Sequence, residues 1–206
     1  LLSAKILVTF STVILLSWIA SRSGPKYAGL MSGFPLGSAI TLYFIGVEQG
    51  ADFAALASIH SLGGLTSSIC LAGAYWWSMT RYPSIKYLPW VLVISLGAFL
   101  LSAWALQHLP SERSANLIIV VAAIFLFRHW FKQIPSSAIA EPRQGLWLKP
   151  WFTLLFRAAI ATAAVLAVTG LASLLSATQA GLLAAFPISF FPLMLILHIS
   201  FGAPML

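Results

Sequence analysis

Charged residues and cysteine are both scarce in this chain of 206 residues, and each shortage excludes a class of protein. Only 7% of the residues are charged and just four are acidic, whereas soluble domains are about 25% charged. The single cysteine, Cys70, can form no intrachain disulfide and has no metal-ligand spacing, so we interpret it as a packing residue. Apolar residues make up 60% of the sequence, more than a soluble globule of this size can bury. The composition therefore excludes a soluble enzyme and is typical of a polytopic membrane protein.

The sequence also lacks the patterns of nucleic-acid binding and of catalysis. Although the net charge is +7, the 11 basic residues are spread between apolar runs, as topology signals are, and form no phosphate-binding stripe. There is no Gly-x-Ser-x-Gly, no His-Glu-x-x-His, no phosphate-binding loop and no cysteine pair. We therefore expect no nucleic-acid partner, no enzymatic activity, no cofactor and no metal site.

Seven apolar segments are candidates to cross a membrane, because a hydrocarbon core of about 30 Å requires about 20 residues of helix. They do not alternate as strands of a β-barrel would, so the predicted fold class is an all-α integral membrane protein with about seven transmembrane helices. The fifth candidate is short, with 14 uncharged residues between Arg113 and Arg128, and it either spans fully with snorkelling arginines or is re-entrant. The candidates are 4–20, 28–47, 53–80, 88–109, 115–130, 152–176 and 180–200.

Basic residues gather in alternate connections and predict an orientation. The connections after the first, third and fifth candidates hold Arg22, Lys26, Arg81, Lys86, Arg128, Lys132, Arg143 and Lys149. The remaining connections hold only Arg113. Because lysine and arginine concentrate in cytoplasmic loops, the first set is expected in the cytoplasm and the N-terminus outside. Residues 132–150 are then a cytoplasmic connecting loop.

An internal repeat divides the chain into two unequal parts. Residues 5–51 align without a gap on residues 157–203 at a constant offset of 152, with ten identities in 47 positions. The centre of the match is Ala-Gly-Leu, three residues, then Phe-Pro, which occurs at 28–35 and again at 180–187. We interpret this match as a duplication. It predicts a first membrane repeat at 1–131, with five spans, and the start of a second at 151–206.

The two copies are expected to have opposite orientations in the membrane. Five candidate spans separate equivalent positions of the two copies. Because this number is odd, the second copy starts on the opposite side of the membrane and is inverted relative to the first. The charges agree, because the basic loop at 21–26 has an uncharged counterpart at 173–178. Inverted repeats of this kind are typical of secondary transporters, whose substrate site lies at the repeat interface. Counterparts of the third to fifth spans are missing from the second copy, so we expect either sequence beyond residue 206 or an asymmetric architecture.

The repeated Phe-Pro pair is the first candidate for a substrate site or pathway. Pro35 and Pro187 each remove a helical hydrogen bond near the middle of a span, and matching broken helices mark transport sites. Gly33, Phe34 and Phe186 accompany them as candidate site residues. The alternative stays open that small residues and proline only serve helix packing, which is common in membrane bundles.

Ionisable residues near or inside the spans are the second candidate, because burying them is costly. Glu48 and Asp52 flank the second connection, and His60 lies two turns into the third span, so Asp52 and His60 can share a helix face. A proton or cation pathway through Glu48 and His60 is one interpretation. The other places the carboxylates at the interface and gives His60 a hydrogen bond to a neighbour. His108 and His198 are expected at interfaces.

The stretch Ala28-Gly29-Leu30, Phe34-Pro35, Tyr43, Glu48 and Gly50 resembles the GlpM-like family of small bacterial inner-membrane proteins. Members of that family are similar to a single copy of this repeat. The second copy keeps only 180–182, 186–187 and Gly202, and has Leu195 and Ser200 where the first has Tyr43 and Glu48. The resemblance implies a bacterial inner-membrane location, but no substrate or mechanism.

Two functions from different classes are compatible with this sequence. The first is an inner-membrane transporter or permease for a small neutral, amphipathic or lipid-like substrate, with proton coupling through Glu48 or His60 left open. Its site is expected where the two Phe-Pro segments meet the third span. The alternative is a non-catalytic membrane subunit that scaffolds a larger complex, with a membrane protein or a second copy of itself as partner. The lipid bilayer is a partner in both.

Overall fold

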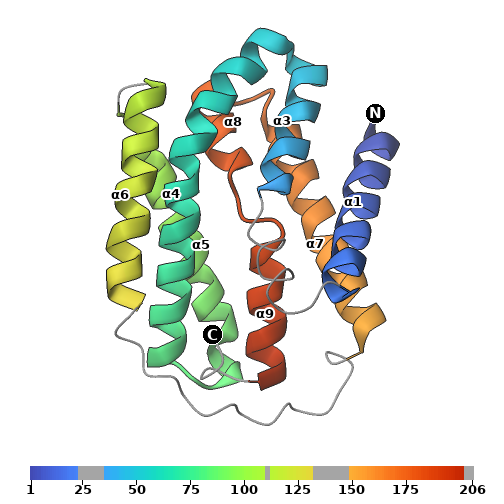
Figure 1. The fold of residues 1–206 in the computed structure, drawn as a ribbon, viewed down its shortest axis with the longest axis vertical. Coiled ribbons are helices and arrows are strands. Elements are labelled where there is room, and N and C mark those ends of the chain that lie inside the picture. The colour runs from blue at the N-terminus through green and yellow to red at the C-terminus, as the bar shows by residue number, and fades with distance from the viewer. Residues whose placement is uncertain (23–34, 110–111, 132–148, 202–206) are drawn as a thin grey trace.

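The computed structural model describes residues 1–22, 35–109, 112–131 and 149–201, and all of the regular structure in these ranges is helical (Figure 1). The helices are α1 (Leu2–Arg22), α3 (Leu36–Gln49), α4 (Ala51–Arg81), the short 3-10 helix η1 (Ile85–Tyr87), α5 (Leu88–Leu106), α6 (Arg113–Phe131), α7 (Pro150–Leu171), α8 (Ala177–Ala184) and α9 (Phe190–Phe201).

Five of the described helices are long and apolar enough to cross a membrane: α1, α4, α5, α6 and α7. Their outward faces carry large apolar side chains, such as Leu101 of α5 and Ile118 and Leu126 of α6, each more than 60% exposed. Such faces are stable next to lipid and costly next to water. The chain is therefore an all-α, membrane-embedded protein. The doubtful fifth candidate is α6, whose 19 residues extend about 28 Å.

The second and seventh candidate spans are not single long helices. Within 28–47, the described part begins at Pro35 and continues as the 14 residues of α3. Within 180–200, α8 ends at Ala184 and α9 begins at Phe190, so the chain is interrupted at Phe186-Pro187. The cause is local, because Pro187 has no N–H to donate and its ring would clash with the carbonyl of the preceding turn.

The helices form two groups with α8 and α9 between them (Figure 1). On one side α1 lies antiparallel along α7. On the other side α4 is central and packs against α5, α6, α3 and α8. From the middle of the molecule α3 runs towards the end where α1 begins, whereas α9 runs towards the opposite end (Figure 1). Helices α3 and α9 therefore diverge from a common level.

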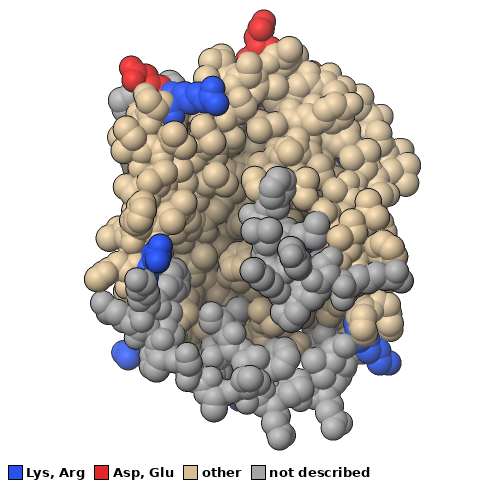
Figure 2. Space-filling view, in the orientation of Figure 1, with Lys and Arg blue, Asp and Glu red and all other residues tan. Residues whose placement is uncertain are grey.

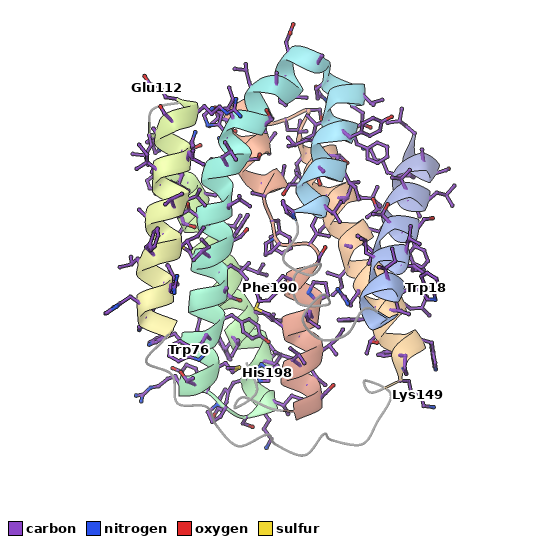
Figure 3. All side chains as sticks on the ribbon, in the orientation of Figure 1. Trp18, Trp76, Glu112, Lys149, Phe190 and His198 are labelled. Atoms are coloured by element: carbon purple, nitrogen blue, oxygen red, sulfur yellow. The ribbon has the colours of Figure 1, made fainter. Side chains whose placement is uncertain are left out.

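Charged residues lie mainly at the two ends of the molecule, and the described acidic residues are all at one end, together with Lys5 and Arg113. The end where α4 and α6 finish and α7 begins carries Arg81, Arg128 and Lys149, and we call it the basic end. The opposite end carries Asp52 and Glu112 (Figures 2 and 3). Most of the described surface between the two ends is uncharged in this view (Figure 2). Figure 3 labels Glu112 at one end and Lys149 at the other.

Two glycines allow α8 to approach α4 at backbone distance. A Cβ added at Gly64 would lie 2.6 Å from the Leu182 carbonyl oxygen, and one added at Gly181 would overlap the Ala57 carbonyl. Small residues at helix contacts allow this closeness in membranes. A third glycine, Gly50, has φ +96° and joins α3 to α4 in a turn that other residues rarely adopt.

The contact at Gly181 gives a direct stability test. We expect Gly181→Ala to lower the free energy of unfolding by about 1–3 kcal/mol, because the added methyl meets backbone that cannot rotate away. Gly97→Ala is the matched control, since a Cβ there meets no atom within 4 Å. Thermal unfolding of both variants in detergent measures the difference. Equal midpoints for the two variants would contradict the close approach.

Candidate functional site

A cavity of about 450 Å³ lies where the start of α3 and the break between α8 and α9 meet α4. Pro35 and Ser38 line it from the start of α3, and Phe186 and Pro187 line it from the break between α8 and α9. The middle of α4 and of α6 forms the other walls, through Leu65, Ser68, Ile69, Ala72, Val120 and Ile124. Figure 2 shows the surface hollowed over the middle of α4, beside the grey atoms. The volume of the cavity is within the usual range for small-molecule pockets.

The start of α3 touches the break between α8 and α9 beside this cavity. A Cβ added at Gly37, the second residue of α3, would lie 2.8 Å from Cβ of Ile188, just after the second break. Behind this contact Ile188 packs with Val13 of α1, Phe44 of α3 and Val165 of α7. The cavity is thus closed on one side by packed apolar side chains.

A serine of α4 completes the hydrogen bonding at the second break. Ser68 Oγ donates to the Ala185 carbonyl oxygen at 2.6 Å. This bond matters because a backbone carbonyl without a partner is costly in a membrane. The chain itself contributes two tight bonds, from Phe186 N–H to Leu183 and from Phe191 N–H to Pro187. The break between α8 and α9 is therefore stabilised by a hydrogen bond from α4 and by backbone hydrogen bonds of the residues on either side of it.

The chemistry of the cavity is neutral and mostly apolar. No charged side chain is among its described lining residues, and the polar groups are the hydroxyls of Ser38, Ser68 and Ser189. The first backbone bond of α3 runs from Ala39 N–H to the Pro35 carbonyl, so earlier amides of that turn have no partner within the helix. These groups can hydrogen-bond a hydroxyl, carbonyl or ester oxygen on an otherwise apolar molecule.

Three of the sequence-predicted site residues, Pro35, Phe186 and Pro187, thus line one cavity. Gly33 and Phe34 lie outside the described residues. Glu48 and His60 are elsewhere: neither is among the residues that line the cavity. The five described candidates therefore do not share one environment.

Glu48 forms an ion pair at the end of the molecule opposite the basic end. Its Oε2 lies 2.7 Å from Nζ of Lys5, which also donates to Thr169 Oγ1 at 2.7 Å. Lys5 is only 5% exposed, while the Glu48 side chain is 26% exposed. The pair joins the start of α1, the end of α3 and the end of α7. Lys5 is not among the predicted site residues, although it is one of two basic residues far from the predicted loops.

His60 is buried against the start of α8. Its Nε2 lies 3.1 Å from Thr178 Oγ1, a hydrogen bond to a neighbour of the kind that was the alternative interpretation. Asp52 is exposed in the first turn of α4, so the two do not share an environment despite their spacing. Beside Thr178, the Ser176 and Gln179 side chains form a capping box that fixes the start of α8.

His198, which was expected at an interface, is buried inside the bundle. The side chain is 1% exposed, and its Nδ1 lies 2.9 Å from the Tyr75 hydroxyl of α4. The two rings also meet edge to face, and Figure 3 shows His198 within the bundle on α9. A position near the end of a span does not by itself imply exposure, because α9 is packed inside the bundle. His108, also expected at an interface, lies next to the end of α5 and meets Trp104 edge to face.

Among the described residues, no group of three His, Cys, Asp or Glu side chains could hold a metal ion. A scan against models of protein families found no match, and searches of curated proteins and of solved structures found none either. The resemblance to the GlpM-like family therefore stays a prediction.

The ion pair of Lys5 predicts a specific loss of stability. We expect Lys5→Met to lower the free energy of unfolding by about 2 kcal/mol, because Glu48 and Thr169 lose a charged hydrogen-bond donor. The double variant Lys5→Met with Glu48→Gln should regain part of the loss, since no unpaired charge remains. The measurement is thermal unfolding in detergent, with exposed Lys86→Met as the control. A Lys5→Met midpoint equal to that of the control would refute the pair's contribution.

Proposed function

We propose that this chain is a bacterial inner-membrane transporter, built from two inverted repeats, for a small neutral, amphipathic or lipid-like molecule. The observation that carries the proposal is the cavity of about 450 Å³ where both interrupted segments meet α4. Transporters with inverted repeats often bind substrate at such a place, between discontinuous helices near the middle of the membrane.

The arrangement of the helices supports the inverted repeat. At the offset of 152, α1 corresponds to α7 and α3 corresponds to α9. The first two lie antiparallel and side by side, and the last two run from the middle towards opposite ends (Figure 1). Val13 and Val165, identical at this offset, belong to the same apolar cluster. Equivalent residues meet in this way close to a two-fold axis.

Two discontinuous spans would complete the count of seven. One is the segment that ends in α3, and the other consists of α8, the break and α9. The basic end would face the cytoplasm by the positive-inside rule, which places the start of α1 outside. The inner-membrane location rests on this rule and on the resemblance to the GlpM-like family.

The lining of the cavity supports an uncharged substrate with a large apolar part. Serine hydroxyls and first-turn amides would bind its polar group, and the side chains of α4 and α6 would contact the rest. Glu48 is paired with Lys5 and His60 with Thr178, outside the cavity. We therefore leave proton coupling through these two residues out of the proposal.

A scaffold subunit remains the second candidate because of one observation. α6 is the least buried of the five long helices, so its apolar face is available to a membrane-protein partner or to a second copy of the chain. Lipid would cover the same face in a transporter. If the chain is a transporter, filling the cavity should abolish its activity. If it is a scaffold subunit, filling the cavity should not.

The test is a transport assay with the purified protein in vesicles. One probe is phosphatidylcholine with a fluorescent acyl chain, whose movement between leaflets is measured by dithionite quenching, and the other is glycerol, measured by osmotic swelling. We expect the wild-type protein to move at least one probe faster than protein-free vesicles. Ala72→Trp fills the cavity from α4 and should reduce the rate to the protein-free value.

Leu101→Trp is the matched control, since Leu101 is 67% exposed on the outer face of α5. It adds the same ring without entering the cavity. Unfolding midpoints of both variants close to wild type show that folding is intact. Equal transport by the two variants would refute the cavity as the pathway. Failure of folded wild-type protein to move either probe would favour the scaffold.

A further inference from the structure

The cavity lies at mid-depth along the two long helices that line it. Val120 is seven residues from Arg113 and Ile124 is seven from Phe131, so each is about 10 Å from the nearer end of α6. On α4 the lining residues fall within 65–72, near the middle of this 31-residue helix. Because a hydrocarbon core is about 30 Å thick, an opening at this depth faces acyl chains and not water.

Packed contacts of α4 lie between the cavity and both ends of the molecule. Towards the end opposite the basic end, Gly64 lies against the Leu182 backbone of α8. Towards the basic end, Gly73 lies against the Phe127 ring of α6, and Tyr75 is buried in a cluster that joins α4 to α5 and α9. In the described structure, the routes along α4 towards either end are therefore occupied by packed side chains.

The lining of the cavity passes from buried residues inside the bundle to exposed residues at its side. Ala185 and Ile188 are each 2% exposed, whereas Phe190 of α9 is 39% exposed and Ile124 of α6 is 51% exposed. Figure 2 shows the hollow from the side of the bundle, over the middle of α4. Figure 3 labels Phe190 at the start of α9, near the same level. The described part of the mouth therefore opens sideways, between α6 and the start of α9.

The route of entry restricts the chemistry of the ligand. A molecule that arrives sideways at this depth must itself dissolve in hydrocarbon, because a charged group there is costly. Inside, it meets the hydroxyls of Ser38, Ser68 and Ser189 among apolar side chains. A hydroxyl both donates and accepts a hydrogen bond, so these groups suit an alcohol, carbonyl or ester oxygen.

We propose that the cavity receives its substrate sideways from the hydrocarbon layer, through the mouth between α6 and the start of α9. The substrate is then an uncharged lipid, with a hydroxyl, carbonyl or ester oxygen next to a long apolar chain. A water-soluble molecule such as glycerol does not reach this mouth. The inference rests on the proposed function, whose cavity it uses, and it adds the route of entry and the class of substrate.

Photolabelling of the full chain in phosphatidylcholine vesicles tests the route. The probe is a diacylglycerol with a diazirine in one acyl chain, and mass spectrometry identifies the labelled peptides. Every residue that faces lipid can react, so the specific signal is the labelling that excess dioleoylglycerol removes. We expect such competed labelling at the mouth, on 120–124 and 187–190. Labelling around Leu101, which is 67% exposed on α5, should fall only as far as dilution of the probe predicts. A mouth that behaves like Leu101 would overturn the proposal.

A filled cavity should lose the competed labelling. We expect Ala72→Trp to remove most of it, because the indole ring occupies the space from the side of α4. Leu126→Trp is the matched control, since Leu126 is 68% exposed on α6 and is not among the lining residues. Equal competed labelling in the two variants would exclude the cavity as the site. The competition in wild type keeps the test decisive if Ala72→Trp does not fold.

A second probe tests the class of substrate. It is phosphatidylglycerol with the same diazirine chain, and we expect its competed labelling of the mouth to be weaker, because its charged headgroup stays at the interface. Competed labelling as strong as that of the diacylglycerol would overturn the uncharged class and identify the chain of an ordinary phospholipid as the ligand.

The vesicle assays separate this inference from the proposed function. Competed labelling by protein that moves neither transport probe would support the sideways entry and count against transport. Movement of glycerol without competed labelling would overturn the sideways entry and leave the transport proposal intact.

Discussion

The contact between α8 and α4 sets the position of both interrupted segments. Gly64 and Gly181 allow the two backbones to touch, and Ser68 then reaches the Ala185 carbonyl one turn further along α4. Because these glycines have no side chain, the break at Pro187 can lie against α4. The Ala185 carbonyl, which has no helical partner there, then accepts a hydrogen bond from Ser68, as backbone in a membrane requires. Ile188 is then brought against Gly37, which positions the start of α3. The cavity is the space left where these contacts end.

Much of this architecture is evident in the sequence because lipid imposes simple rules on length and polarity. Five of the seven predicted spans are long helices, and Pro187 interrupts a sixth where its missing N–H requires it. The Phe-Pro pair was also enough to place Pro35, Phe186 and Pro187 together with α4. The sequence could not predict that Pro187 would separate two short helices over 185–189, because proline can equally kink a continuous helix.

The roles of individual polar residues were much harder to predict, because helix spacing fixes a face but not a partner. Glu48 and His60 are ionisable residues near span ends, yet Lys5 and Thr178 occupy them outside the cavity. His198 looked interfacial, but Tyr75 lies 123 positions earlier and binds it inside the bundle. A signal for Lys5 was present in the alignment, since it corresponds to another basic residue, Arg157, at the offset of 152.

The contact of α4 with α8 has a consequence for biosynthesis. The ribosome releases α4 before α8, with the entire length of α5, α6 and α7 between them. The glycine face of α4 must therefore wait, since its partner Gly181 is made much later, and Lys5 has Glu48 early but Thr169 only once α7 is made. Until then the early helices expose a groove inside the membrane that lipid or an insertion factor has to cover. Assembly of the interior is accordingly a late, post-insertion event that depends on the last third of the described chain.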